Sequence, residues 1–183
     1  MCIRGFCEDD APNFSFRSPP CSFYSGSKAL GEEAIRGVGR SYVWRLRIPF
    51  DEFDNERNFL SKLQRYAKVY DNVNSISHRA DFVKACLDSW VKKIPYGIYN
   101  MTNPGAISSR QVVAMIKSAL RLNREFAFWE SDQEFYQQGA QTPRSNCVMD
   151  VSKILAAGVV IRPVEEALED SLRCWSPEIG RRC

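Results

Sequence analysis

The sequence of 183 residues has a single histidine, His78, and none of its seven cysteines forms a C-x-x-C pattern. An odd number of widely spaced cysteines does not predict a disulfide framework, and one histidine without paired cysteines does not predict a zinc site. No run approaches the roughly 18–20 apolar residues that span a bilayer, and residues 1–10 hold no apolar stretch of signal-peptide length. We therefore expect reduced thiols, no bound metal, no membrane association and a cytoplasmic protein.

The sequence also has little excess charge. Its net charge is +3 at pH 7, and the basic residues form only short clusters such as Arg45 with Arg47 and Arg181 with Arg182. A nucleic-acid-binding protein would usually show a basic stripe, so we expect no nucleic-acid partner. The hydrophobic fraction of 44% and the charged fraction of 26% are those of an ordinary globular domain with a core.

Apolar periodicity and turn residues divide the chain into alternating helices and strands. Apolar residues three and four apart predict helices over residues 24–36, 58–68, 79–92, 108–120, 150–156 and from 163 onward. Runs rich in β-branched and aromatic residues predict strands over residues 40–50, 73–77, 97–101 and 126–129. Residues 1–23 are expected to be loop, and residues 130–146 largely so. Strands that alternate with helices indicate an α/β protein.

Three of these helices carry more detailed signals. Ser108 and Gln111 fit a capping box at a helix start. The helix over residues 79–92 is expected to be amphipathic, with one apolar stripe formed by Phe82, Val83, Cys86, Leu87 and Trp90. The last helix should begin at Pro163 and turn toward the core the side chains of Val164, Ala167, Leu168 and Leu172.

Tyr24 and Lys28 form the motif that suggests chemistry. A tyrosine and a lysine four residues apart on a helix lie on one face, one turn apart. In that arrangement an ammonium group stabilises a phenolate, and the phenol can protonate a carbonyl oxygen as hydride arrives. The spacing also fits a tyrosine at a helix start beside an unrelated surface lysine, so by itself it leaves both interpretations open.

Further motifs surround this pair in a definite order. They are Pro12-Asn13-Phe14 before it, Gly31-Glu32 after it, and then Leu46-Arg47-Ile48-Pro49, Asn58-Phe59, Tyr99-Asn100-Met101-Thr102-Asn103-Pro104-Gly105, Pro143-Arg144-Ser145-Asn146 and Met149-Asp150. In this order and spacing the chain resembles the extended short-chain dehydrogenases/reductases, over roughly Gly5 to Trp175. Within that superfamily it is most similar to the 3,5-epimerase/4-reductases of nucleotide-rhamnose synthesis and to dTDP-4-dehydrorhamnose reductase.

The resemblance implies a fold and a division of the chain. The fold would be the C-terminal portion of a Rossmann-like doubly wound parallel sheet, with a smaller substrate-binding α/β region. Residues 1–183 would form a single partial unit. Residues 1–100 would form the end of the Rossmann-like core. Within the chain, residues 51–72 and 101–183 would contribute mainly to the substrate-binding region.

The resemblance also implies roles for individual residues. Tyr24 would be the general acid that reduces the C4 ketone of a sugar, and Lys28 would bind the nicotinamide ribose of NAD(P)H and tune Tyr24. Lys62 would assist epimerisation, unless it is simply a solvated helix lysine. The remaining residues implied to face the substrate are Asn58, Asn103, Arg144 and Asn146. Arg144 also fits a loop arginine in solvent, and Asn103 also fits turn chemistry before Pro104.

The sequence lacks the glycine-rich turn with which this superfamily binds the pyrophosphate of its cofactor. Neither G-x-G-x-x-G nor G-x-x-G-x-x-G occurs, and Gly37-Val38-Gly39 follows a helix instead of preceding one. The superfamily's catalytic Ser or Thr would lie well before Tyr24, where only 23 residues stand. We therefore expect the N-terminal dinucleotide-binding half to be absent, and the chain to be a fragment, to form a homo-oligomer or to be completed by another chain.

Three hypotheses about function follow. The first is a reductase, or a combined epimerase and reductase, of a nucleotide-linked 4-keto-6-deoxysugar that uses NAD(P)H. The second is a non-catalytic nucleotide-sugar-binding or regulatory protein on the same scaffold, and the third is a degenerate fragment without function. Fold resemblance alone does not separate them.

Overall fold

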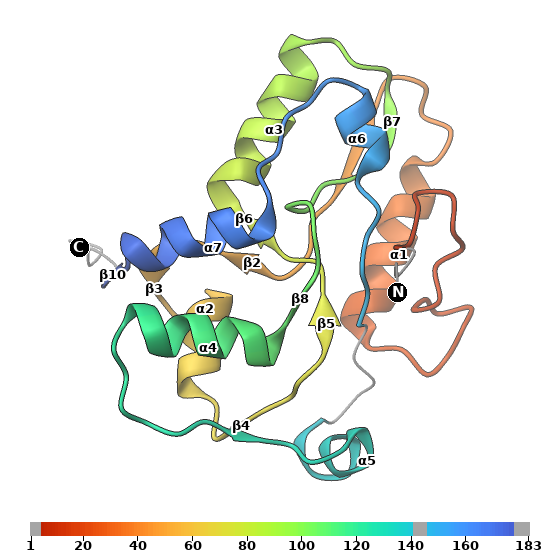
Figure 1. Cartoon of the computed structure of the whole chain (residues 1–183). Coiled ribbons are helices and arrows are strands. Elements are labelled where there is room, and N and C mark those ends of the chain that lie inside the picture. Colours follow the sequence, from red (N-terminus) through yellow and green to blue (C-terminus); the bar gives the residue numbers. More distant parts are fainter. Residues whose placement is uncertain (1–4, 141–145, 178–183) are drawn as a thin grey trace, which may run out of the picture.

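The computed structural model describes residues 5–140 and 146–177, and it confirms an α/β protein (Figure 1). The helices are α1 (Phe23–Ile35), α2 (Phe59–Arg65), α3 (Arg79–Val91), α4 (Ser109–Ala119), α5 (Asp132–Glu134), α6 (Ser152–Ala156) and α7 (Val164–Arg173), with a π-helical turn at Phe135–Gly139. The strands are β1 (Tyr42–Arg45), β2 (Pro49–Phe50), β3 (Phe53–Asp54), β4 (Lys68–Val69), β5 (Val73–Asn74), β6 (Ser77–His78), β7 (Gly97–Asn100), β8 (Ile107–Ser108), β9 (Ala127–Phe128) and β10 (Ser176–Pro177). No helix in the described ranges is long and apolar enough to cross a membrane.

The strands pair two by two. Four pairs are parallel, namely β1 with β7, β2 with β6, β3 with β10 and β4 with β9, and β5 pairs with β8 in the antiparallel sense. The longest pair aligns Trp44 of β1 with Tyr99 of β7. Parallel strands joined through helices are what alternating elements predict.

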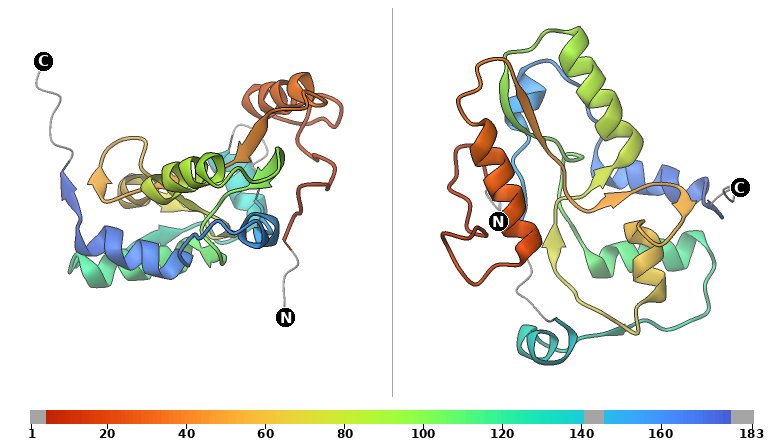
Figure 2. Two further views of the ribbon diagram at one scale, coloured as in Figure 1. Left: turned by 90° about the horizontal axis from the view of Figure 1, so that it is seen from above. Right: turned by 180° about the vertical axis from the view of Figure 1, so that it is seen from behind.

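The β1–β7 pair separates two layers of helices. Successive strand residues point to opposite faces, so Trp44 and Arg45 face different layers. Trp44 and Tyr99 pack into a hydrophobic cluster with Ala85 of α3 and Ile154 of α6. The Arg45 side chain instead reaches Glu32 of α1. Seen from above, α1 lies apart from the other helices (Figure 2).

A second hydrophobic cluster joins α2, α4 and α7. Its fully buried side chains include Leu60, Ile116 and Leu168, and burying each such side chain is worth about 1.5–3 kcal/mol. The core face expected for the last helix is confirmed, because Val164, Ala167, Leu168 and Leu172 are all buried. Pro163 is the residue that caps this helix, one position before its first turn.

Several helix starts match their sequence signals. Ser108 accepts a hydrogen bond from the Gln111 backbone at 3.1 Å, and the Gln111 side chain accepts one from the Ser108 backbone at 2.9 Å. The predicted capping box at α4 is therefore confirmed. At α1, Ser22 Oγ accepts from the Ser25 backbone at 3.1 Å, which starts the helix one residue before the predicted position.

The apolar stripe expected on α3 lies only partly in the core. The helix itself is confirmed, but Val83, Leu87 and Trp90 are 56%, 61% and 65% exposed. Its buried residues are Ala85 and Ser89, on the face that packs against β7. Apolar periodicity predicts an amphipathic helix, but it does not identify which face of the helix packs against the sheet.

Two further expectations are corrected. The strand expected over residues 40–50 is broken between β1 and β2, where Ile48 has a φ of 41°. The segment expected to be loop over residues 130–146 contains α5 and the π-helical turn instead. The reason lies in packing, because the Phe135 ring stacks on Tyr70 with centroids 3.8 Å apart.

Candidate functional site

Helix α1 presents Tyr24 and Lys28 on one face. Lys28 Nζ lies 5.5 Å from the centroid of the Tyr24 ring, so the two side chains stack one turn apart as their spacing predicts. Both side chains are exposed, Tyr24 to 70%. Their reactive groups are therefore accessible to a ligand, and neither is consumed by packing in the core.

The inner face of α1 carries a glycine at its closest contact with the preceding loop. Gly26 is buried, and a Cβ at this position would lie 2.3 Å from the Phe16 ring. A larger residue would therefore push the ring away. The glycine allows the loop that contains Phe16 to lie directly against the helix.

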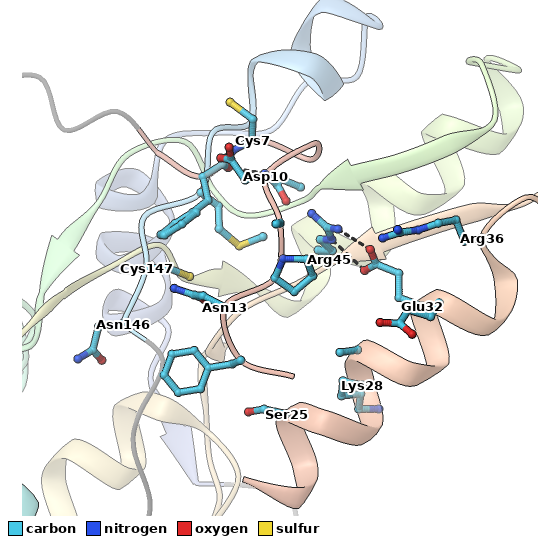
Figure 3. Close-up of a pocket in the computed structure, with 18 residues that line it drawn as sticks. Cys7, Asp10, Asn13, Ser25, Lys28, Glu32, Arg36, Arg45, Asn146 and Cys147 are labelled. Carbon is cyan, nitrogen blue, oxygen red and sulfur yellow. Dashed lines mark hydrogen bonds and ion pairs between the residues drawn. The ribbon is translucent and has the colours of Figure 1, made fainter. Parts of the chain in front are cut away.

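A pocket of about 270 Å³ opens beside α1. It is bounded by α1, by residues 6–14 and by residues 146–149, which lie next to each other because the Phe6 backbone pairs with Met149 (Figure 3). Lys28 and Asn146 both line this pocket. Tyr24 is not among its lining residues, and it stands one turn before Lys28 at the exposed end of the helix.

A network of polar groups crosses the pocket wall. Arg45 donates to Glu32 of α1 from Nε at 2.9 Å and from Nη2, and its Nη1 donates to the Glu8 carbonyl oxygen at 3.2 Å. Glu8 Oε1 accepts a hydrogen bond from the Asn100 backbone at 2.7 Å. The hydrogen bond to Glu32 raises the pKa of Arg45 above its ordinary value, against the effect of desolvation. Glu32 and Asn100 belong to the sequence motifs and Arg45 to a short basic cluster, whereas no sequence signal pointed to Glu8.

Asn100 adds a free acceptor to this wall. Its Nδ2 donates to the carbonyl oxygens of Phe6 and Asp150 at 2.8 and 2.9 Å, which fixes the orientation of the amide. Its Oδ1 is buried and has no hydrogen-bond partner within the described residues. A buried acceptor without a partner is costly, so a donor on a ligand in this pocket would be stabilised there.

The predicted substrate residues divide into two groups. Asn146 lines the pocket and accepts a hydrogen bond from Asn72 Nδ2. Lys62 is exposed on α2, and neither it nor Asn58 or Asn103 lines the pocket. Arg144 lies outside the described residues.

Asn58 and Asn103 are both buried and bonded within the protein. Asn58 caps α2 by accepting from the Leu60 backbone at 3.0 Å, and its amide donates to Asp51 Oδ1 at 2.8 Å. Asn103 accepts from the His78 backbone at 2.7 Å and donates to Asp81 at 2.9 Å. That Asn58 and Asn103 bind the substrate stays a prediction. The structure shows that Asn58 caps α2 and that Asn103 connects His78 to Asp81.

The Asn103 contacts belong to a charged cluster around Asp81. Arg162 Nε donates to Asp81 at 2.7 Å, and the buried His78 lies against the same carboxylate at 3.3 Å. Burial raises the pKa of Asp81, but hydrogen bonds from His78, Arg162 and Asn103 outweigh it and lower the pKa to about 2. The described residues hold no group of three or more His, Cys, Asp or Glu side chains suited to a metal ion.

Comparison with known proteins identifies the family. Residues 6–175 match the family model described as the RmlD substrate binding domain. The chain belongs to this family. A trifunctional UDP-glucose 4,6-dehydratase/UDP-4-keto-6-deoxy-D-glucose 3,5-epimerase/UDP-4-keto-L-rhamnose-reductase of Arabidopsis thaliana is 32% identical over 165 residues, which cover 90% of this chain and 24% of that protein. A bifunctional dTDP-4-dehydrorhamnose 3,5-epimerase/dTDP-4-dehydrorhamnose reductase of the same plant is 31% identical over 165 residues, 90% of this chain and 52% of that protein. The chain therefore spans about half of the bifunctional relative and about a quarter of the trifunctional one.

Solved structures share the fold of this RmlD-family chain. The L780 UDP-rhamnose synthase of Acanthamoeba polyphaga mimivirus superimposes with a TM-score of 0.80 at 22% identity, covering 93% of this chain and 57% of the synthase. The dTDP-4-dehydrorhamnose reductase of Bacillus anthracis, solved in complex with NADP, gives a TM-score of 0.69 at 20% identity, covering 92% and 57%. The expected fold, part of a Rossmann-like α/β structure, is confirmed.

Proposed function

We propose that the chain is the substrate-binding half of an NAD(P)H-dependent reductase, or combined epimerase and reductase, of a nucleotide-linked 4-keto-6-deoxysugar. The observation that carries the proposal is the exposed Tyr24–Lys28 pair beside a pocket, in a chain of the RmlD family. The reductase and synthase names of the relatives support the same substrate class.

In this proposal α1 supplies the proton for the reduction. The Tyr24 hydroxyl protonates the C4 oxygen of the sugar, and Lys28 stabilises the phenolate that remains. NAD(P)H supplies the hydride when it is bound. The exposed Lys28 ammonium fits the ribose hydroxyls of such a cofactor, because it is free of ion pairs with the described residues. The pyrophosphate of NAD(P)H would be held by a glycine-rich turn, which residues 1–183 do not contain.

The remaining predicted residues complete the proposed site. Arg144 and Asn146 would hold the nucleotide end, where a planar guanidinium can form two parallel bonds to a diphosphate. Lys62 would assist epimerisation from α2. Asn58 and Asn103 would shape the substrate region through the contacts that fix Asp51 and Asp81.

We further propose that a dinucleotide-binding polypeptide completes this half, in the cytoplasm. Within the described residues β1 pairs only with β7, so its other edge is free to accept a strand. The buried Trp44 Nε1 in β1 has no hydrogen-bond partner in the part of the chain that the structure describes. The side chains of Phe23 and Leu87, on the two flanking helices, are 81% and 61% exposed. An open edge between two apolar faces favours a partner that continues the sheet.

The alternative is a non-catalytic protein that binds a nucleotide sugar. Such a protein would need no cofactor and therefore no glycine-rich turn. It differs from the main proposal in one respect, because Tyr24 and Lys28 would then have no chemical role.

Isothermal titration calorimetry tests the nucleotide site directly. We expect the 183-residue chain to bind UDP or dTDP and to bind NADPH far more weakly, since the pyrophosphate of NADPH has no glycine-rich turn to hold it. Asn146→Ala should weaken UDP or dTDP binding by several-fold, whereas Asn123→Ala, at an exposed asparagine that does not line the pocket, serves as the matched control. An absence of heat with every nucleotide would contradict a substrate-binding half.

Complementation tests the proposed partner. We expect the chain to co-elute in a one-to-one complex with the part of the bifunctional Arabidopsis relative that lies outside the match, and to melt at a higher temperature in that complex. Trp44→Ala should weaken the complex because Trp44 lies at the open edge. Elution of the chain as a self-associated dimer, unaffected by the added polypeptide, would point to a second copy instead.

A further inference from the structure

Helix α1 carries the Tyr24–Lys28 pair, yet it contributes no residue to either hydrophobic cluster of the described chain. Its one buried residue is Gly26, which has no side chain to anchor. Phe23 and Leu30 on its outer side are 81% and 49% exposed. A helix usually takes its position from an apolar face buried in the core, so another interaction must place this one.

The interaction that ties α1 to the sheet is the Glu32–Arg45 ion pair. Arg45 stands on β1 opposite Asn100 of β7, and its guanidinium donates to both carboxylate oxygens of Glu32, as Figure 3 shows. The side chains are only 21% and 17% exposed, so water screens this pair less than a surface pair. Two parallel charge-assisted hydrogen bonds fix an orientation as well as a distance.

Among residues 5–140 and 146–177, the other side-chain contacts of α1 are with the loop that precedes it. Arg17 pairs with Glu33 at 3.0 Å, but the Arg17 side chain is 78% exposed. The Phe16 ring covers Gly26. Both partners belong to the loop that leads into α1, so neither contact sets the distance from the helix to β1.

We propose that Glu32 and Arg45 position the active-site helix and thereby set where Tyr24 and Lys28 stand relative to the sheet. Glu32 follows Lys28 by one helical turn and Tyr24 by two, so all three side chains share one face. Glu8 extends the tie, because its backbone oxygen accepts from Arg45 and its carboxylate accepts from the Asn100 backbone. The catalytic meaning of this tie rests on the proposed function, whereas its geometry does not.

Hydrogen exchange in the 183-residue chain tests the tie without reference to activity. The variants are Arg45→Lys, which keeps the charge but loses the planar fork, and Glu32→Gln, which keeps one acceptor. Amides of α1 should exchange about tenfold faster or more in both, with α4 unchanged as an internal reference. Glu33→Gln, which breaks the exposed pair on the same helix, is the matched control and should leave α1 unchanged.

The outcomes are separable. Faster exchange confined to α1 supports the positioning role, while unchanged exchange in α1, or an equal increase in α4, overturns it. In the chain completed by a dinucleotide-binding half, Arg45→Lys should lower kcat about tenfold and leave the KM for the nucleotide sugar within about twofold, because the chemistry and not the binding is displaced. If the unaltered complex reduces no nucleotide sugar, the proposed function fails, but the exchange result still decides whether the ion pair places α1.

Discussion

Tyr24→Phe should abolish most ketone reduction in the chain completed by a dinucleotide-binding half. Loss of a positioned general acid typically costs about 10²–10⁴-fold in rate. The substitution removes one hydroxyl from an exposed ring, so folding and nucleotide binding should not change. Steady-state oxidation of NADPH with a UDP- or dTDP-linked 4-keto-6-deoxysugar measures the effect, and calorimetry with UDP or dTDP measures binding.

The matched control is Tyr66→Phe. Tyr66 is also an exposed tyrosine next to a helix, but it follows α2 and does not line the pocket. Turnover should be unchanged in this variant. Equal turnover in Tyr24→Phe and the unaltered protein would remove Tyr24 from the mechanism and favour the non-catalytic alternative.

Asp81→Asn should destabilise the fold by about 1–3 kcal/mol at pH 7, because it leaves Arg162 and His78 beside a neutral group. Urea unfolding followed by tryptophan fluorescence measures this. Asp88→Asn is the matched control on the same helix, since the ion pair that Asp88 forms within the described residues is with the exposed Lys84. Stability in that control should be almost unchanged.

The same carboxylate gives a pH dependence with a definite sign. The pKa of Asp81 is about 2 in the folded protein and 3.8 in its ordinary state, so its contribution to stability is complete above pH 3.8 and is lost as the pH falls toward 2. The loss amounts to about 2 kcal/mol. Asp81→Asn should flatten this part of the stability curve, and an unchanged slope between pH 4 and pH 2 would contradict the assignment.

Local signals made several elements predictable from the sequence. The helix predicted over residues 24–36 matches α1 to within one residue at each end, and Ser108 with Gln111 fixes the start of α4, because helix ends depend on residues close in the chain. The core face of α7 follows from its strong apolar periodicity. Tyr24 and Lys28 share a face for the same reason, since one helical turn relates them.

Long-range contacts were not predictable in this way. Arg45 was predicted to belong to a short basic cluster. Its ion pair with Glu32 forms because α1 lies over β1. Phe135 read as part of a polar loop, but stacking on Tyr70 orders the turn around it. Leu87 was predicted to belong to one apolar stripe of an amphipathic helix, but its side chain is 61% exposed. Each of these depends on which elements meet in space, and periodicity carries no information about that.

The two hydrophobic clusters have no residue in common. Substitutions at distant sites without shared partners usually contribute additively to stability. Ile154, beneath β7, and Leu168, on α7, can therefore accept or lose volume independently, so that one region can drift in sequence while the other keeps its shape. Such a protein can change the residues around one hydrophobic cluster during evolution without repacking the other.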